Sequence, residues 1–226
     1  MLPKAVADSL QTARKSQPAM NPSQSPRSPG RPRSDSTRQA ILDASAHLLE
    51  TLDYDKISIE RIAAEAKVGK QSIYRWWGGK ADVMLAAYSE RVLPRLPPRE
   101  PTDDAIDDLN VFLKQYFETV QAPLVRRAMQ GLLAEAQLDA DFRLRFYGVF
   151  VASRRTVFRH ILRTGKATGQ LRADLDIELM IDLLNGAFWY RLLSGAEDEI
   201  NDTFADRLIH TLLPSLLPPD ATADRA

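Results

Sequence analysis

The sequence predicts an all-α protein of about nine helices, with a small N-terminal and a larger C-terminal helical domain. Apolar residues recur at helical spacing from Asp35 onward. No segment shows the sustained period-two alternation, rich in β-branched residues, that indicates a strand. A run with four prolines in eight positions, residues 94–101, separates the two helical parts, because a helix interior does not tolerate proline.

Residues 1–34 form a predicted disordered basic arm with six basic residues and one acidic residue. The arm is rich in Ser, Pro and Gln and contains no apolar run, so it lacks the material for a core. It is not a secretory signal, because no apolar stretch of about 7–15 residues follows the basic ones. An Arg- and Ser-rich, acid-poor start is also typical of an organelle transit peptide, and this alternative remains open.

Four helices are predicted in the N-terminal domain, residues 35–93. The first spans about 36–53 behind a Ser34/Asp35 cap, the second follows a Ser58 N-cap, the third spans 70–77, and the fourth starts at Lys80. Residues 67–69 interrupt the second helix and Gly78-Gly79 end the third. The predicted inward residues of the first two helices are Ile41, Leu42, Ser45, Leu48, Leu49, Leu52, Ile59, Ile62, Ala63 and Ala66.

Five helices are predicted in the C-terminal domain, residues 102–217. Caps, proline starts and apolar periodicity place them at about 102–120, 123–137, 139–164, 176–194 and 202–213. Pro214 is expected to end the last one.

Composition excludes several functional classes. The absence of cysteine excludes a disulfide scaffold, a cysteine-based metal site and thiol catalysis. No stretch reaches the roughly 18 apolar residues of a membrane span. The three histidines lie far apart in the sequence, without a His or carboxylate partner at i+4, and no nucleophile motif is present. We therefore expect a cytoplasmic protein that is not an enzyme, with no catalytic residue, metal, cofactor or membrane partner.

The net charge of zero, from 30 basic and 30 acidic residues, hides an uneven distribution. The arm has a net charge of +5, and residues 67–80 contain four basic residues and no acid, whereas residues 94–226 contain 16 basic and 20 acidic residues. This asymmetry indicates a polyanionic partner.

Residues 58–77 have the pattern of a helix-turn-helix: two short helices, a tight turn and a longer bracing helix before them. The second short helix can enter a major groove, which makes double-stranded DNA the predicted partner. Lys70 and Gln71 lie where a recognition helix reads bases, Ser72 can donate to a phosphate, and Lys80 starts a helix whose dipole also attracts anions. A solvated basic face between two core helices remains an alternative.

The stretch from Ser58 to Lys80, with residues 38–46 before it, resembles the N-terminal domain of the TetR family of transcriptional regulators. The resemblance lies in the Ile-Ala-x-x-Ala helix from Ile62, the valine in the turn, the Ile73-Tyr74 pair, and the aromatic and lysine spaced after it. Three departures are Lys67 where the turn commonly has glycine, Gly69 in place of a Ser or Thr cap, and Gly78-Gly79 in place of a Pro/Ser-type linker.

The resemblance implies a homodimer that binds an operator through its N-terminal domains and an unknown small-molecule effector in its C-terminal domain. By position, Lys70, Gln71 and Tyr74 approach base edges, and Ser58, Ser72, Trp76 and Lys80 contact phosphates. Tyr74 could equally belong to the core with Ile73, and Trp77 is expected to be a core residue.

Two further sites are predicted. Pro29–Arg33 resembles the Gly-Arg-Pro core of an AT-hook, so Arg31 and Arg33 are candidates for the minor groove, an inert basic tail being the alternative. The candidate ligand-pocket residues are Phe117, Gln121, Phe146, Phe150, Asn185 and Trp189, although aromatic stripes at helical spacing are usually core.

The apolar helices 176–194 and 202–213 are the expected dimer interface, with ordinary intramolecular packing as the alternative. We interpret the sequence as a ligand-responsive repressor of a palindromic operator. The alternative is a helical small-molecule-binding or interaction protein in which the helix-turn-helix only packs.

Overall fold

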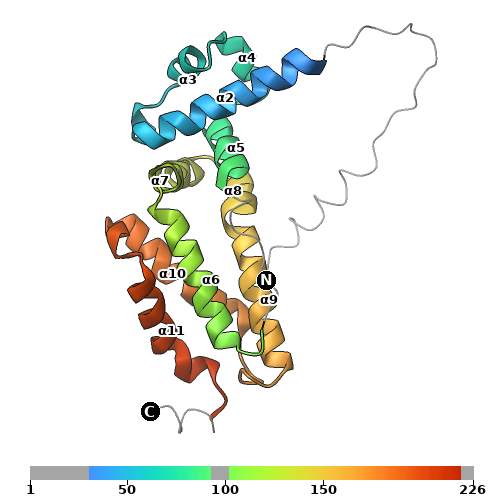
Figure 1. Ribbon diagram of the computed structural model, residues 1–226, viewed down its shortest axis with the longest axis vertical. Coiled ribbons are helices and arrows are strands. Elements are labelled where there is room, and N and C mark those ends of the chain that lie inside the picture. Colours follow the sequence, from blue (N-terminus) through green and yellow to red (C-terminus); the bar gives the residue numbers. More distant parts are fainter. Residues whose placement is uncertain (1–30, 93–101, 220–226) are drawn as a thin grey trace, which may run out of the picture. The chain divides into compact units, whose positions relative to one another are not determined.

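A computed structural model describes residues 31–92 and 102–219, and all regular secondary structure within these ranges is helical (Figure 1). The N-terminal domain contains α2 (Arg31–Thr51), a 3-10 turn η1 (Tyr54–Lys56), α3 (Ile59–Glu65), α4 (Lys70–Tyr74) and α5 (Lys80–Val92). The C-terminal domain begins with α6 (Ala105–Gln121), α7 (Pro123–Leu138) and α8 (Ala140–Phe146). It continues with a π-helical segment η3 (Tyr147–Ala152), α9 (Ser153–Ala167), α10 (Ile177–Ser194), a 3-10 turn η4 (Glu197–Glu199) and α11 (Asp202–Leu216).

Side-chain caps set the starts of α3, α6, α8, α10 and α11. The Asp104 carboxylate accepts from the backbone N–H groups of Ile106 and Asp107, and the Asp139 carboxylate accepts from that of Phe142. The caps of α3, α10 and α11 are Ser58, Asp176 and Asn201. Each cap satisfies a backbone donor that has no partner within the helix, so these starts follow from local sequence.

Some helix ends differ from the sequence prediction. α2 begins at Arg31 rather than near residue 36, and Pro32 falls in its first turn, where a helix tolerates proline. α11 passes through Pro214 to Leu216. Leu216 and Leu217 are buried there and the Leu217 N–H donates to the Leu213 carbonyl, so tertiary packing outweighs the proline signal. The predicted helix 139–164 reaches Ala167 and contains the π-helical segment η3.

One hydrophobic core extends through both domains. Every residue of the predicted stripes of α2 and α3 is buried in it or packs against it, which confirms that part of the prediction. α5 and α7 contact each other, and the ring of Tyr54 in η1 lies against Gly131 of α7 so closely that an added Cβ would lie 2.0 Å from its Cγ. The Tyr54 hydroxyl also donates to Glu135, at 3.2 Å, so η1, which directly precedes α3, is packed on α7.

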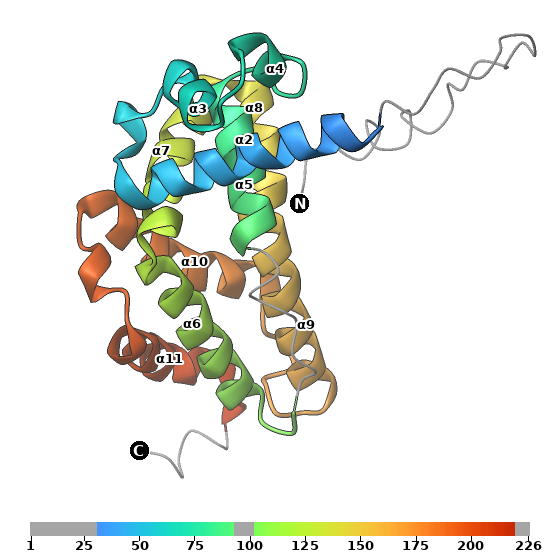
Figure 2. The ribbon, with the colours of Figure 1, turned by 45° about the horizontal axis from the view of Figure 1, so that its top comes forward.

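The main contacts among the C-terminal helices join α6 with α9 and α11, α7 with α8, and α9 with α10. Figures 1 and 2 show α6 beside α11, although these two helices are far apart in the sequence. No helix among residues 31–92 and 102–219 combines the length and the apolar character of a membrane span.

Candidate nucleic-acid interface and effector site

The helix-turn-helix is formed by α3, α4 and the turn between them (Figure 2). Ile62, Ala63 and Ile73 are buried and hold the two short helices on the core. Lys67 in the turn has φ 55°, in the left-handed region, and the Val68 N–H closes the turn on the Ala63 carbonyl at 2.9 Å. Because only one side of α4 faces the core, its other residues are available to a partner.

The predicted base-reading residues lie on this available side. Lys70 and Gln71 are exposed, and Tyr74 is 56% exposed, so Tyr74 is not a core residue. Trp77 is half-buried and packs against the core, as predicted. Ser72 is half-buried between the two sides.

Lys70 has an acidic neighbour, Glu60, on α3. Its Nζ lies 3.0 Å from the Glu60 Oε1, and both side chains are exposed. The pKa of Glu60 is lowered by its own backbone N–H, then by Lys70 and by the Ser58 hydroxyl. Exposed pairs contribute little to stability, so Lys70 can exchange Glu60 for a DNA acceptor at small cost.

Two of the predicted phosphate contacts, Ser58 and Lys80, are already engaged within the protein. The Ser58 hydroxyl oxygen caps α3 by accepting from the Arg61 N–H at 3.3 Å. Lys80 is half-buried, with its Nζ 4.0 Å from the centroid of the Tyr54 ring and 3.2 Å from the Tyr54 carbonyl oxygen. These contacts fix the first turn of α5, which follows the recognition helix.

Trp76 lies at the edge of the same surface and is 39% exposed. The Arg75 guanidinium lies 5.6 Å from the Trp76 ring centroid. Trp76 also lines an open hollow of about 680 Å³ together with Trp77 and Arg145. Its ring is therefore reachable both from the α4 side and from this hollow.

The side chains of the remaining predicted DNA contacts, Arg31 and Arg33, lie outside what the structure describes, and residues 29–30 lie outside it entirely. The backbone of residues 31–33 is helical, whereas the resemblance to an AT-hook implied an extended segment.

Three of the predicted pocket residues come together in the C-terminal domain. The rings of Phe146 and Phe150 stack with centroids 4.7 Å apart, and Trp189 lies 6.3 Å from Phe146. Phe117 stacks instead on Phe188 and Phe204. Phe117, Phe146 and Phe150 are buried, so these aromatics are packed together in this structure.

The two predicted polar pocket residues lie apart from one another. Gln121 donates to the Ile200 carbonyl and lines a surface hollow of about 580 Å³ at the start of α11. Asn185 is buried on α10, and its Nδ2 donates to the Ile181 carbonyl at 2.8 Å. The amide groups of both residues therefore already have backbone partners.

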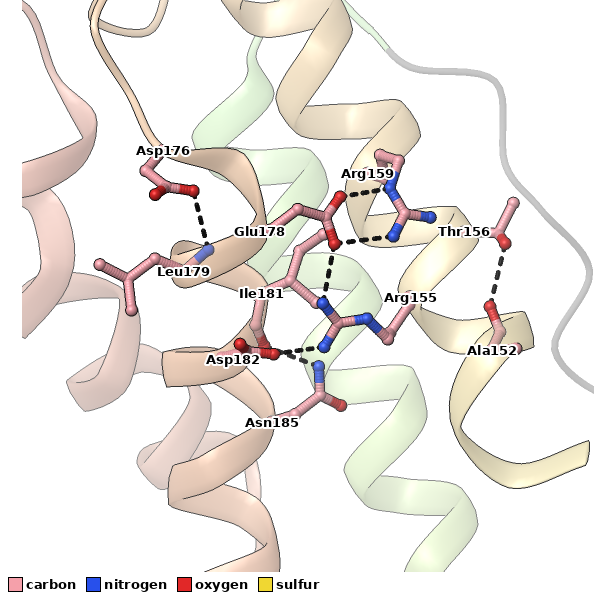
Figure 3. A network of polar contacts seen from close by, with 10 residues as sticks. All are labelled: Ala152, Arg155, Thr156, Arg159, Asp176, Glu178, Leu179, Ile181, Asp182 and Asn185. Atoms are coloured by element: carbon pink, nitrogen blue, oxygen red, sulfur yellow. Dashed lines mark hydrogen bonds and ion pairs between the residues drawn. The ribbon is translucent and has the colours of Figure 1, made fainter. Parts of the chain in front are cut away.

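An ion-pair network that no sequence pattern indicated joins α9 and α10 (Figure 3). Arg159 holds Glu178 through two bonds of 2.6 and 2.8 Å, and Arg155 bonds both Glu178, at 2.8 Å, and Asp182. The hydrogen bonds from Arg159 and Arg155 lower the pKa of Glu178 to about 2. Asn185 lies next to this network on α10.

A buried cation was also missed. Arg154 on α9 is 3% exposed and lies among Tyr88 of α5, Tyr116 of α6 and Phe150 of η3. The adjacent Arg155 is partly exposed. The position of Arg154 in the sequence therefore gives no sign that its side chain is buried.

A row of apolar residues on α10 faces away from the core. Leu179, Leu183, Tyr190 and Leu193 are exposed, and Gly186 has open space where a Cβ would stand. The 4-3-4-3 spacing of these five positions places them on one side of the helix. Other apolar residues of the same region, Leu175, Leu184 and Phe188, are buried within the chain.

The two short helices, their tight turn and the exposed Lys70 and Gln71 of α4 define a helix-turn-helix DNA-binding protein. Residues 41–87 match the family described as "Bacterial regulatory proteins, tetR family", and residues 99–212 match "Tetracyclin repressor-like, C-terminal domain". The chain belongs to the TetR family of transcriptional regulators.

Individual relatives agree with this assignment. The chain is 31% identical over 196 residues to the uncharacterized HTH-type transcriptional regulator YdeS of Bacillus subtilis, covering 85% of this chain and 96% of YdeS. It is 24% identical to the DNA-binding transcriptional repressor TetR of Mycobacteroides abscessus, covering 84% and 98% of the two chains. The crystal structure of a TetR family transcription regulator matches at 30% identity with a TM-score of 0.64, covering 81% and 100%.

Proposed function

We propose that this protein is a ligand-responsive repressor that acts in the cytoplasm and binds a palindromic operator as a homodimer. The observation that carries the proposal is the exposed side of α4, where Lys70, Gln71 and Tyr74 stand opposite the buried Ile73. If the residues of α4 served only to complete the core, this side of the helix would be covered by other parts of the chain. In this arrangement Lys70 and Gln71 read base edges in the major groove and Ser72 donates to a phosphate.

Selection of the preferred DNA site from a random pool tests the operator. We expect a palindrome whose half-site centres lie about 10 base pairs or a multiple apart, as two recognition helices of a dimer require. A selected site without internal symmetry contradicts the palindromic operator.

The double substitution Lys70→Ala with Gln71→Ala tests the groove contact. Because both side chains are exposed, the variant keeps its melting temperature while its sequence-specific affinity falls at least tenfold. Arg163→Ala, an exposed charge on α9, is the control and keeps full affinity. A variant that melts early, or that still selects the operator, favours a helix-turn-helix that only packs.

The exposed apolar row of α10 supports the homodimer. A self-complementary pair of helices can bury such a row against its own copy, and Gly186 allows the two backbones to approach closely. α11 adds the half-buried Leu208 and Leu212.

The substitution Leu183→Glu introduces a charge into this row and is expected to give a monomer by light scattering. Leu138→Glu is the control, because Leu138 is exposed at the C-terminal end of α7, outside the row. A Leu183→Glu protein that remains dimeric contradicts this interface.

The ligand response follows from coupling between the domains. An effector that binds better to one arrangement of the C-terminal helices shifts the population toward it. α5 joins α4 to the C-terminal core through Tyr88, so such a shift changes the separation of the two recognition helices in the dimer. Loss of the spacing of about 34–36 Å abolishes simultaneous binding to two half-sites.

A further inference from the structure

The interior of the C-terminal domain contains a positive charge with no acidic partner among the described residues. Arg154 forms none of the ion pairs found in residues 31–92 and 102–219. Its Nη1 donates to the Phe150 carbonyl and its Nη2 to the Tyr88 hydroxyl, both at 2.6 Å. The guanidinium carbon lies 4.6 Å from the Tyr116 ring centroid.

This centre has more donors than acceptors. The Arg154 Nε has no hydrogen-bond partner, and neither has the hydroxyl of Tyr116, which is 1% exposed. Burial raises the pKa of Tyr88 and of Tyr116, although the Arg154 charge opposes this, so both hydroxyls keep their protons. A buried cation beside protonated phenols is a costly arrangement unless an anion joins it.

The position of Arg154 adds an independent observation. The π-helical segment η3 ends two residues before it, and the Phe150 carbonyl that accepts from it belongs to that segment. Isolated π-helical turns frequently occur at functional sites, because they are retained despite their poorer hydrogen bonding. Phe150 also stacks on Tyr88 with centroids 3.9 Å apart, so the surroundings are aromatic.

We propose that Arg154, Tyr88 and Tyr116 form the anion-recognition centre of the effector site, and that the effector is a carboxylic acid with an apolar body. The inference rests on the proposed ligand-responsive function. Two carboxylate oxygens match the guanidinium fork, and the Tyr116 hydroxyl supplies a further donor. One negative charge balances Arg154, and the neighbouring aromatic rings suit an apolar body.

Binding in this way has a consequence for α5. A carboxylate that occupies the Arg154 fork replaces the Tyr88 hydroxyl or the Phe150 carbonyl as acceptor. Tyr88 lies on α5, the helix that follows the recognition helix. When the carboxylate replaces the Tyr88 hydroxyl, the hydrogen bond from Arg154 of α9 to α5 is lost.

The test uses the full-length protein and four probes, octanoate, decanoate, phenylacetate and 2-naphthoate, each with its primary amide. Melting temperature and calorimetric titration report binding without DNA. We expect at least one acid to bind and its amide to bind at least tenfold more weakly. If none of the acids binds at millimolar concentration, or if an amide binds as tightly as its acid, the proposal is overturned.

Three variants assign the binding to this centre. Tyr116→Phe removes one hydroxyl without a partner, so it folds and weakens acid binding severalfold. Arg154→Met combined with Tyr88→Phe removes both partners of one bond together and abolishes binding, whereas Arg163→Ala changes nothing. Unchanged acid binding in the Arg154 variant overturns the proposal, even if Tyr116→Phe has an effect.

Operator affinity is then measured with and without the bound acid. An acid that binds through Arg154 and weakens operator binding supports both proposals. An acid that binds through Arg154 without changing operator affinity overturns its role as effector and leaves the anion centre. If the wild-type protein selects no operator, the proposed function is overturned. The acid-binding measurements are made without DNA, so they still test the anion centre.

Discussion

The turn between α3 and α4 offers a substitution whose effect can be worked out from one dihedral angle. Lys67 has φ 55°, a conformation that costs a residue with a side chain about 1–2 kcal/mol. Lys67→Gly removes this strain but increases the conformational freedom of the unfolded chain, which offsets about 0.4–1 kcal/mol. The net expectation is a gain of about 0.5–1 kcal/mol in the free energy of unfolding. For a chain of this size that corresponds to a rise of about 2 °C in melting temperature.

Calorimetry and urea titration of the purified variant measure this gain. Lys67→Ala is the matched control, because it removes the same exposed charge and keeps a Cβ in the left-handed region. The glycine variant should be more stable than both the wild type and the alanine variant. Equal stability of the glycine and alanine variants would refute the reasoning, because the change would then come from the lost charge.

Three other substitutions probe separate contacts. Glu60→Gln frees Lys70 and removes a negative charge facing DNA, so operator affinity in fluorescence anisotropy should rise about fivefold at low salt, and an unchanged affinity would count against the pair. Gly131→Ala forces the Tyr54 ring to move, so urea titration should show a loss of about 1–3 kcal/mol, and an unchanged midpoint would contradict this packing. Glu178, with its pKa lowered to about 2 from 4.5, stabilises the fold above pH 4.5 and loses this effect as the pH falls toward 2. The stability difference between wild type and Glu178→Gln should therefore shrink over that range, and a constant difference would exclude the ion pairs as its source.

Apart from the start of α2, which is Arg31 rather than a residue near 36, helix starts could be predicted from the sequence because their signals are local. Ser58, Asp139 and Asp176 each cap the helix that the sequence analysis placed after them. The residue at which a helix ends depends also on tertiary packing, which the local sequence does not show. Pro214 does not end α11, because the burial of Leu216 and Leu217 holds two further residues in place.

The exposed side of α4 was predictable for a related reason. α4 has five residues and packs on the core through Ile73, so its opposite side stays exposed. The positions of Lys70 and Gln71 on that side follow from helical periodicity. Tyr74 could not be assigned this way, since a tyrosine suits both a core and a surface. The structure leaves Tyr74 exposed and packs Trp77 against the core instead.

The interior of the C-terminal domain was the least predictable part, because aromatic periodicity reports burial and not a cavity. Phe146, Phe150 and Trp189 lie together, whereas Phe117 stacks on Phe188 and Phe204, and nothing in the sequence pattern indicated the charged centre beside them. Arg154 is one of two consecutive arginines on α9, and its neighbour Arg155 forms the partly exposed network with Glu178 and Asp182 (Figure 3). One residue along a helix is a rotation of about 100°, which carries the next side chain from that network into the core. Burial of a guanidinium there depends on Tyr88 and Tyr116, which come from two other helices, so a single chain segment holds no sign of it. A cation retained at such a position without an acidic neighbour is expected where binding, rather than stability, determines the residue.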